Sequence, residues 1–243
     1  MKQAMNKTVV KAVAQAFTVG LLLAGSVAQA AGVADMVGFW QPVKKIETLK
    51  TSAGQTPPLN AAGKEAYQAN LDAAKEGDRS FDIERKCLPL GLTRLLAESP
   101  FEFMVAKKEA GLIFEWNRVV HMINLRDKHE REKYEAQYAY PYYNGHSIGY
   151  AKGNTFVIDS IYFNEDNTLD KSGLPHSEDL HVTQTLQLKD ANTLESTLTI
   201  EDKQYYSKPW QTKLTFTRLP AGATLKEDVC TERMGLKKLD TEK

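Results

Sequence analysis

Three of the chain's five histidines fall between Asn144 and His181, in segments rich in turn-forming residues. His146 stands in the string Asn144-Gly145-His146-Ser147-Ile148-Gly149. His176 and His181 stand in Gly173-Leu174-Pro175-His176-Ser177-Glu178-Asp179-Leu180-His181. Histidine exchanges protons near neutral pH and is the commonest metal ligand in proteins. This stretch therefore predicts a site for acid–base or metal chemistry.

A hairpin after His146 can bring a carboxylate to its imidazole. If Lys152-Gly153 is a two-residue turn, Ala151 pairs with Asn154, and His146 lies directly opposite Asp159 on the same face. The carboxylate would then orient the imidazole and raise its pKa, as in a general-base dyad. A glycine bulge would shift the register by one residue and turn Asp159 to the other face. A buried structural His–Asp hydrogen bond is the alternative interpretation of the same pair.

His176 and His181 can join His146 at one opening, because His176 lies in a turn and His181 begins a strand. We expect His146 to act as the base, Asp159 to orient it, and His176 or His181 to act as the acid or electrophile. Three imidazoles can also hold a divalent metal such as Zn²⁺, although the spacing matches no compact zinc motif. His176 can equally be a hydrogen-bonding residue that fixes the long loop. No organic cofactor is expected.

Serines and aromatic residues flank the histidines. Adjacent strand residues point to opposite faces, so His146 cannot activate Ser147, and no Gly-x-Ser-x-Gly elbow is present. A serine hydrolase is therefore not the favoured interpretation. Tyrosines are dense from Tyr134 to Tyr143, and such side chains suit a pocket for a ring-containing molecule, although core packing explains many of them equally well. The predicted ligand-binding residues are Trp116, Tyr142, Tyr143, Asn144, Asn164 and Ser177.

Most of the chain has the pattern of β-strands. Residues 60–75 predict the longest helix, with Asn60 as its cap and Gly77 as its stop, and a short helix is predicted over residues 92–97. Strands are predicted at residues 37–43, 101–105, 112–116, 119–125, 147–151, 155–163, 182–188, 194–200 and 210–217. Turns are predicted at Glu109-Ala110-Gly111, Asp127-Lys128, Lys152-Gly153 and Asp190-Ala191-Asn192. The pattern favours a mostly β fold: an antiparallel meander closing into a lipocalin-like barrel or a strongly curved sheet, with a β-sandwich as the alternative.

Residues 1–30 have the pattern of a removable export signal. Three lysines precede an apolar run over residues 16–24, and Ala28-Gln29-Ala30 is a small-x-small cleavage pattern. The apolar run is too short for a membrane anchor, so no integral membrane span is expected after cleavage. The remaining 213 residues (243 − 30) suit one β-rich domain over residues 31–243, in the periplasm or outside the cell.

Charge and cysteine content narrow the class of protein. The whole chain has 31 basic and 31 acidic residues; without the three signal lysines the balance is 28 against 31, or −3. This balance predicts no basic face for nucleic acid. Cys87 and Cys230 are the two cysteines, and an oxidising compartment favours a disulfide between them. Two thiols, or a cysteine nucleophile, are the alternatives.

Several strings resemble a family of exported bacterial β-rich proteins. They are Asn144-Gly145-His146-Ser147-Ile148-Gly149, Val157-Ile158-Asp159-Ser160, Phe163-Asn164, Gly173 to His181, Thr199-Ile200-Glu201-Asp202 and Pro209-Trp210, together with Cys87-Leu88-Pro89 and Cys230. The resemblance covers most of the chain after the signal and implies no particular activity. The chain departs from it at Asp127-Lys128-His129, where members tend to have an Asp-Gly-Arg turn before a histidine.

Two classes of function follow from these residues. The first is an acid–base lyase, isomerase or hydrolase that acts on a small, largely apolar or aromatic molecule in a histidine-lined pocket. The second is a noncatalytic carrier of such a ligand in the cell envelope. A structural envelope protein would leave the clustered histidines unexplained. Whether the three histidines converge on one cavity separates these classes.

The export signal leads to a first prediction. The protein secreted by an expressing bacterium should begin near Ala31, because a signal peptidase cuts after the small-x-small pattern. Intact-mass measurement of the exported protein would show this start. A chain that keeps Met1 in the exported fraction would contradict it.

Overall fold

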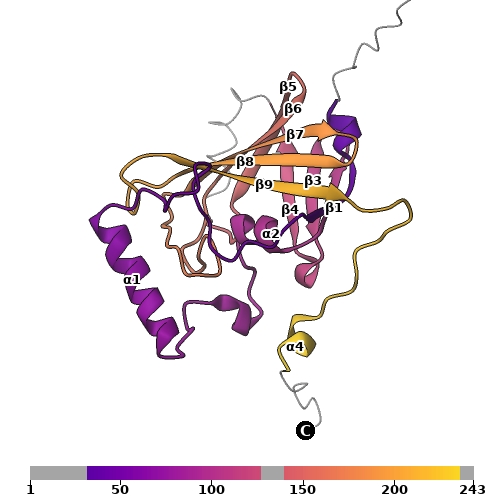
Figure 1. Cartoon of the computed structure of the whole chain (residues 1–243). Coiled ribbons are helices and arrows are strands. Elements are labelled where there is room, and N and C mark those ends of the chain that lie inside the picture. Colours follow the sequence, from indigo (N-terminus) through magenta and orange to yellow (C-terminus); the bar gives the residue numbers. More distant parts are fainter. Residues whose placement is uncertain (1–31, 127–139, 236–243) are drawn as a thin grey trace, which may run out of the picture.

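Nine β-strands close into a barrel at the centre of the molecule (Figure 1). This computed structural model describes residues 32–126 and 140–235. The strands are β1 Gly38–Pro42, β2 Phe101–Val105, β3 Glu109–Phe114, β4 Val120–Leu125, β5 His146–Lys152, β6 Thr155–Ile161, β7 His181–Asp190, β8 Thr193–Glu201 and β9 Trp210–Arg218. The helices are η1 Val33–Met36, α1 Ala61–Lys75, η2 Ile83–Lys86, α2 Leu92–Glu98, η3 Trp116–Arg118 and α4 Cys230–Arg233.

The barrel closes because β1 pairs on both sides. Trp40 lies opposite Phe101 of β2 and opposite Arg218 of β9. The prediction of a mostly β barrel is confirmed, and the sandwich alternative is wrong. Among the strand pairs that the structure describes, β4 and β5 alone run parallel, which the antiparallel meander did not predict. A parallel pair needs a long connection, and β5 begins at the same end of the barrel as β4.

The β2–β3 turn lies earlier than the sequence predicts. The amide of Ala106 donates to the carbonyl of Glu109 at 2.7 Å, which closes a turn over residues 106–108. The predicted turn residues Glu109-Ala110-Gly111 belong instead to β3, where Ala110 and Gly111 are buried. The predicted turn at Asp127-Lys128 lies outside the described residues.

The β5–β6 turn is shifted by one residue. Lys152 pairs with Thr155, so the turn is Gly153-Asn154, and Gly153 has φ +60°. Glycine adopts this left-handed φ readily, and it is the residue that a type II′ hairpin turn needs first. Ala151 therefore pairs with Phe156, and the predicted pairing with Asn154 is wrong.

The barrel interior is filled by side chains. Along β7, β8 and β9, buried and more exposed residues alternate, as the two-residue period of a strand requires. Phe101 packs edge-on against Phe216 with ring centroids 5.0 Å apart, and Phe103 packs against Phe156 at 5.4 Å. Burying each such side chain contributes about 1.5–3 kcal/mol. A small molecule would therefore meet this protein at the ends or the wall of the barrel.

Helix α1 packs against a long connection of the barrel. Asn60 caps α1 by accepting from the amide of Gly63 at 2.9 Å, which confirms the predicted helix start. In Figure 1, α1 lies beside the connections at one end of the barrel, and two of its side chains bond the connection between β6 and β7: Tyr67 bonds Ser172, and Asn70 bonds the carbonyl of Gly173. The predicted short helix forms as α2, and most of it is buried.

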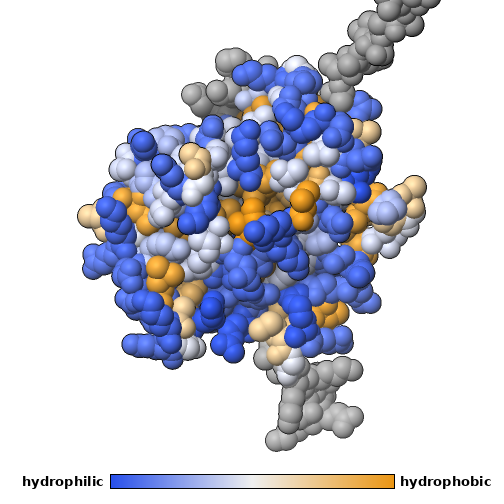
Figure 2. Space-filling view, in the orientation of Figure 1, coloured by the Kyte–Doolittle hydropathy of each residue, from blue (hydrophilic) through white to orange (hydrophobic). Residues whose placement is uncertain are grey.

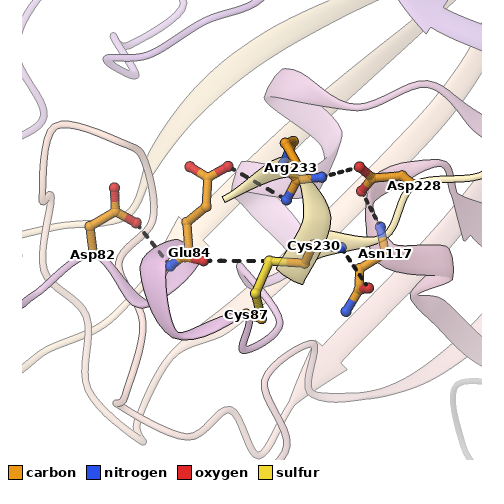
Figure 3. Close-up of a disulfide and its surroundings, with 7 residues drawn as sticks. All are labelled: Asp82, Glu84, Cys87, Asn117, Asp228, Cys230 and Arg233. Atoms are coloured by element: carbon orange, nitrogen blue, oxygen red, sulfur yellow. Dashed lines mark hydrogen bonds and ion pairs between the residues drawn. A yellow bond between two sulfur atoms is a disulfide. The ribbon is translucent and has the colours of Figure 1, made fainter. Parts of the chain in front are cut away.

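A disulfide joins Cys87 to Cys230, as the two-cysteine count predicts (Figure 3). Their Cα atoms are 5.6 Å apart, across 143 residues of sequence. Around it, Arg233 forms an ion pair with Asp228 and lies 3.8 Å from Glu84. These contacts fasten the segment after β9 to η2 (Figure 3).

Hydrophilic residues cover most of the face seen in Figure 2, and hydrophobic residues interrupt it in small groups. Within residues 32–126 and 140–235, helices are all too short or too polar to cross a membrane.

The disulfide leads to a prediction about stability. Reduction should lower the free energy of unfolding, because a closed loop of this length restricts the unfolded chain by an upper estimate of about 5 kcal/mol. Urea unfolding with and without reductant measures the difference. The double variant Cys87→Ser/Cys230→Ser should match the reduced protein and be insensitive to reductant. Equal stability of oxidised and reduced protein would contradict the prediction.

Candidate functional site

A tight turn places His146 at the start of β5. Gly145 has φ +69°, and a Cβ there would lie 2.8 Å from the carbonyl oxygen of Ile161, so the position requires glycine. The Nε2–H of His146 donates to the carbonyl of Tyr140 at 3.0 Å, and the ring of Tyr142 packs edge-on at 4.3 Å. Since a carbonyl only accepts, the neutral imidazole has its proton on Nε2, and Nδ1 is its basic atom.

A second histidine, His121 of β4, reaches Ser147 from inside the barrel. Its Nε2 lies 2.9 Å from Ser147 Oγ, and Ser147 Oγ lies 2.6 Å from Ser160 Oγ. Ser147 and Ser160 are cross-strand partners on β5 and β6 that both face inward, which explains their short separation. His121 is in phase with Ile123, whose backbone pairs with Ser147 in the parallel ladder. The three side chains form one buried hydrogen-bonded chain.

Burial keeps the two imidazoles neutral. Desolvation and, to a smaller extent, the nearby charge of a protonated His146 together lower the pKa of His121 to about 4. Desolvation also lowers the pKa of His146, and its hydrogen bond to the carbonyl of Tyr140 opposes that shift. Both rings are therefore uncharged at neutral pH and can accept a proton.

These two histidines line one hollow at the wall of the barrel, called here the β4–β5 hollow. Its volume is about 350 Å³. Its lining residues are Pro89, Val119, Val120, His121, Met122, Asn124, Tyr142, Tyr143, Asn144, Gly145, His146 and Ser147. The predicted residues Tyr142, Tyr143, Asn144 and His146 thus meet in one place. Asn144 Oδ1 is buried and has no hydrogen-bond partner among the residues that the structure describes.

Asp159 binds His181, not His146. His181 Nε2 lies 2.6 Å from Asp159 Oδ1, and its Nδ1 lies 3.9 Å from Glu201. The predicted pairing of Asp159 with His146 is wrong because the shifted turn places Ile161 opposite His146 and Ile148 opposite Asp159. His181 lines a separate hollow of about 530 Å³. Charged residues dominate that hollow: Asp179, Glu201, Asp202, Lys203 and Lys208.

His176 is a structural residue of the long loop. It is buried; its Nδ1–H donates to the carbonyl of Ser177 at 3.1 Å, and its Nε2 lies 2.8 Å from Asn167 Oδ1. Desolvation lowers its pKa, and the bond to Ser177 opposes the shift. Ser177 in turn donates its amide and its hydroxyl to the carboxylate of Asp202. His176 and Ser177 tie the loop down, the alternative that the sequence left open for His176.

Asn164 and Trp116, two further predicted ligand-binding residues, lie outside the lining of the β4–β5 hollow. The amide of Asn164 donates to the carbonyl of Tyr142 at 3.0 Å, so its backbone supports the turn before His146. The guanidinium carbon of Arg233 lies 5.3 Å from the centroid of the Trp116 ring. It belongs to the packing near the disulfide.

The prediction that His146, His176 and His181 line one cavity is wrong. His146 lines the β4–β5 hollow, His181 lines the charged hollow, and His176 is buried within the loop. The described ranges contain no group of three or more His, Cys, Asp or Glu side chains arranged to hold a metal ion, so the three-imidazole metal site does not form.

Sequence reasoning missed His121 and underrated Ser147. The statement that His146 cannot activate Ser147 is correct, since Ser147 points inward while His146 shares the outer face of β5 with Ile148. A signal for His121 was present: in Val120-His121-Met122-Ile123 it alternates in phase with a core isoleucine. Its partner strand was not readable, because β5 joins β4 in parallel after a long connection.

The neutral state of His121 leads to a prediction about pH. Its pKa is about 4 in the folded protein against 6.5 when solvated, so between these values the unfolded chain binds more protons. Stability on the order of 3 kcal/mol is therefore present above pH 6.5 and is lost as the pH falls to 4. Urea unfolding at pH 7 and pH 4.5 should show a smaller loss in His121→Gln than in the parent protein. An equal loss in both proteins would contradict the prediction.

Comparison with protein-family models, with curated proteins and with solved structures finds no match for this chain. The resemblance to exported bacterial proteins therefore stays a prediction. Function must therefore be inferred from the geometry of the chain itself. Within the described residues, the β4–β5 hollow brings together two histidines and a serine, His121, His146 and Ser147.

Proposed function

We propose that this chain binds a small, largely apolar or aromatic molecule in the β4–β5 hollow and moves a proton on it, in the periplasm or outside the cell. The supporting observation is that two neutral imidazoles, those of His121 and His146, line the same hollow. A neutral imidazole near a bound molecule is the commonest general base in enzymes. His146 is the base toward a molecule bound in the hollow, because its side chain is only partly buried, whereas His121 is 2% exposed.

The lining of the hollow defines the class of ligand. Val119, Val120 and Met122 supply apolar surface, and Tyr142 and Tyr143 supply rings for stacking or edge contacts. A volume of about 350 Å³ lies in the range that small-molecule pockets have. Asn144 Oδ1, buried without a partner among the described residues, would be satisfied by a hydroxyl or N–H of the ligand. The expected ligand is therefore an apolar or aromatic molecule with one hydrogen-bond donor.

The charged hollow at His181 supports a weaker case. Asp159 and Glu201 lie on either side of the His181 ring, at 2.6 Å and 3.9 Å from its two nitrogens. A hollow lined by both acidic and basic side chains does not suit an apolar molecule. The β4–β5 hollow therefore carries the proposal.

One observation favours a noncatalytic carrier as the second candidate. His121 and Ser147 are only 2% and 1% exposed, so a ligand that leaves the barrel wall unchanged would touch them little. In a carrier the histidines would only hydrogen-bond the ligand. The two candidates share the binding site and differ in whether a proton is transferred.

Binding is tested by filling the hollow. Val120 lines it and is 48% exposed, so Val120→Trp should occupy the space and weaken binding of small phenols, including the phenolic ketone 4-hydroxyacetophenone, by about tenfold, or about 1.4 kcal/mol. Val43→Trp is the matched control, because Val43 is 62% exposed and is absent from the lining. Ligand-observed NMR measures both variants. Equal binding to both would place the ligand elsewhere and overturn the proposal.

Proton transfer is tested with the same ketone. In D₂O a general base should exchange the methyl hydrogens of bound 4-hydroxyacetophenone for deuterium, which proton NMR detects. His146→Gln keeps a donor for the carbonyl of Tyr140 and should bind the ketone while losing exchange by about 100-fold. Binding without exchange in the parent protein would support the carrier.

A further inference from the structure

Ser147 has the hydrogen bonds that a serine nucleophile needs, although they come from residues far from it in sequence. His121 Nε2 lies 2.9 Å from its Oγ, and the hydroxyl of Ser160 lies 2.6 Å from the same oxygen. In a neutral imidazole one nitrogen accepts a hydrogen bond, whereas a hydroxyl can donate one hydrogen bond and accept another. Ser147 can therefore donate to His121 while it accepts from Ser160.

We propose that Ser147 is an acyl-accepting nucleophile with His121 as its general base, so that the β4–β5 hollow hydrolyses small esters with an apolar or aromatic part. The inference rests on the proposed function, because the same hollow must admit the molecule. It also requires the barrel wall beside Ser147 to open when the molecule binds, because Ser147 and His121 are 1% and 2% exposed. It adds a substrate class, small esters, and a covalent step. Ser147 and His121 carry out that step, and His146 does not.

The reaction is balanced by the residues present and one water. Ser147 Oγ forms a bond to the ester carbonyl carbon while its proton passes to His121 Nε2. The carbon–oxygen bond to the alcohol or phenol then breaks, and the leaving oxygen takes the proton from His121. A water attacks the acyl-serine, passes a proton to His121, and releases the acid as Ser147 regains its proton. Ester and water give acid and alcohol.

The surroundings of His121 suit this role and set its limits. Burial lowers its pKa, so the imidazole stays unprotonated well below neutral pH but is a weaker base than a solvated histidine. Within residues 32–126 and 140–235, no carboxylate hydrogen-bonds to His121, so the pair lacks the orienting acid of a complete triad. Turnover is therefore slow, and the acyl-serine persists long enough to be captured. Ser160 is a positioning residue that holds Ser147 Oγ toward His121.

The barrel offers a matched control serine. Ser196 of β8 is fully buried and faces the interior, as Ser147 does, but its partner is the side-chain amide of Gln184 at 3.1 Å. It has no histidine partner in the described part of the chain and is absent from the lining of the hollow. If any serine inside the barrel could react, Ser196 would be labelled as readily as Ser147.

The experiment uses diisopropyl fluorophosphate on the mature protein, with peptide mapping of the adduct. The parent protein should gain one adduct, at Ser147. Ser147→Ala should gain none, His121→Gln should react about 100-fold more slowly, and Ser196→Ala should react as the parent does. Mapping the parent needs no variant, so the test holds even if Ser147→Ala fails to fold. The labelling rate should fall only as the pH approaches 4, the pKa of His121.

The outcomes separate this inference from the proposed function. An adduct elsewhere, or none, together with binding of 4-hydroxyacetophenone that Val120→Trp weakens, would overturn the role of Ser147 as nucleophile and leave the proposed binding site standing. An adduct at Ser147 that Val120→Trp slows about tenfold would support both proposals. A labelling rate that falls near pH 6.5 would overturn the role of His121, because it would indicate a solvated imidazole.

Discussion

The parallel ladder between β4 and β5 determines where the polar groups of the barrel interior lie. Three residue pairs define it, with Ile123 opposite Ser147, Asn124 opposite Ile148 and Leu125 opposite Gly149. A shift by one residue would turn Ser147 outward, and a shift by two would move His121 out of its reach. Gly149 helps to fix this register, because a Cβ there would lie 2.6 Å from Ile123 and 2.7 Å from Phe156. Close packing of one glycine thus keeps the histidine and the serine together.

The interior combines this polar group, and the pair Gln184 and Ser196, with a largely apolar core. A polar side chain without a partner is costly at this depth, and a charged one more so. The chain from His121 through Ser147 to Ser160 meets the requirement by bonding the hydroxyls to one another and leaving the imidazole neutral. The buried cation of α2 is handled differently, since Arg94 is surrounded by carboxylates of Asp82, Glu84 and Glu98. The protein therefore keeps the buried His121 uncharged and pairs the buried charge of Arg94 with carboxylates.

Local sequence signals were enough to predict most helices and strands. The prediction of the site was less accurate, because it depends on which distant strands pair. The cap at Asn60, the strand periods and the disulfide all depend on signals that lie within a few residues or on a count of two cysteines. The turn at Gly153-Asn154 differed from the prediction by one residue, and that single step moved the expected partner of Asp159 from His146 to His181. His121 required the β4–β5 pairing, which no local pattern reveals. Four of the predicted site residues line the hollow together, because Tyr142 to His146 lie in and next to one turn.

The disulfide also constrains the order of events when the chain is made. Cys230 follows every strand of the barrel, so the bond cannot form until all nine strands have been synthesised. With two cysteines in the chain, no mispaired bridge within one molecule exists. Until Cys230 emerges, the thiol of Cys87 can be oxidised only onto another molecule. The bridge therefore locks a barrel whose strands are already present, and the period before it closes is when covalent dimers would arise.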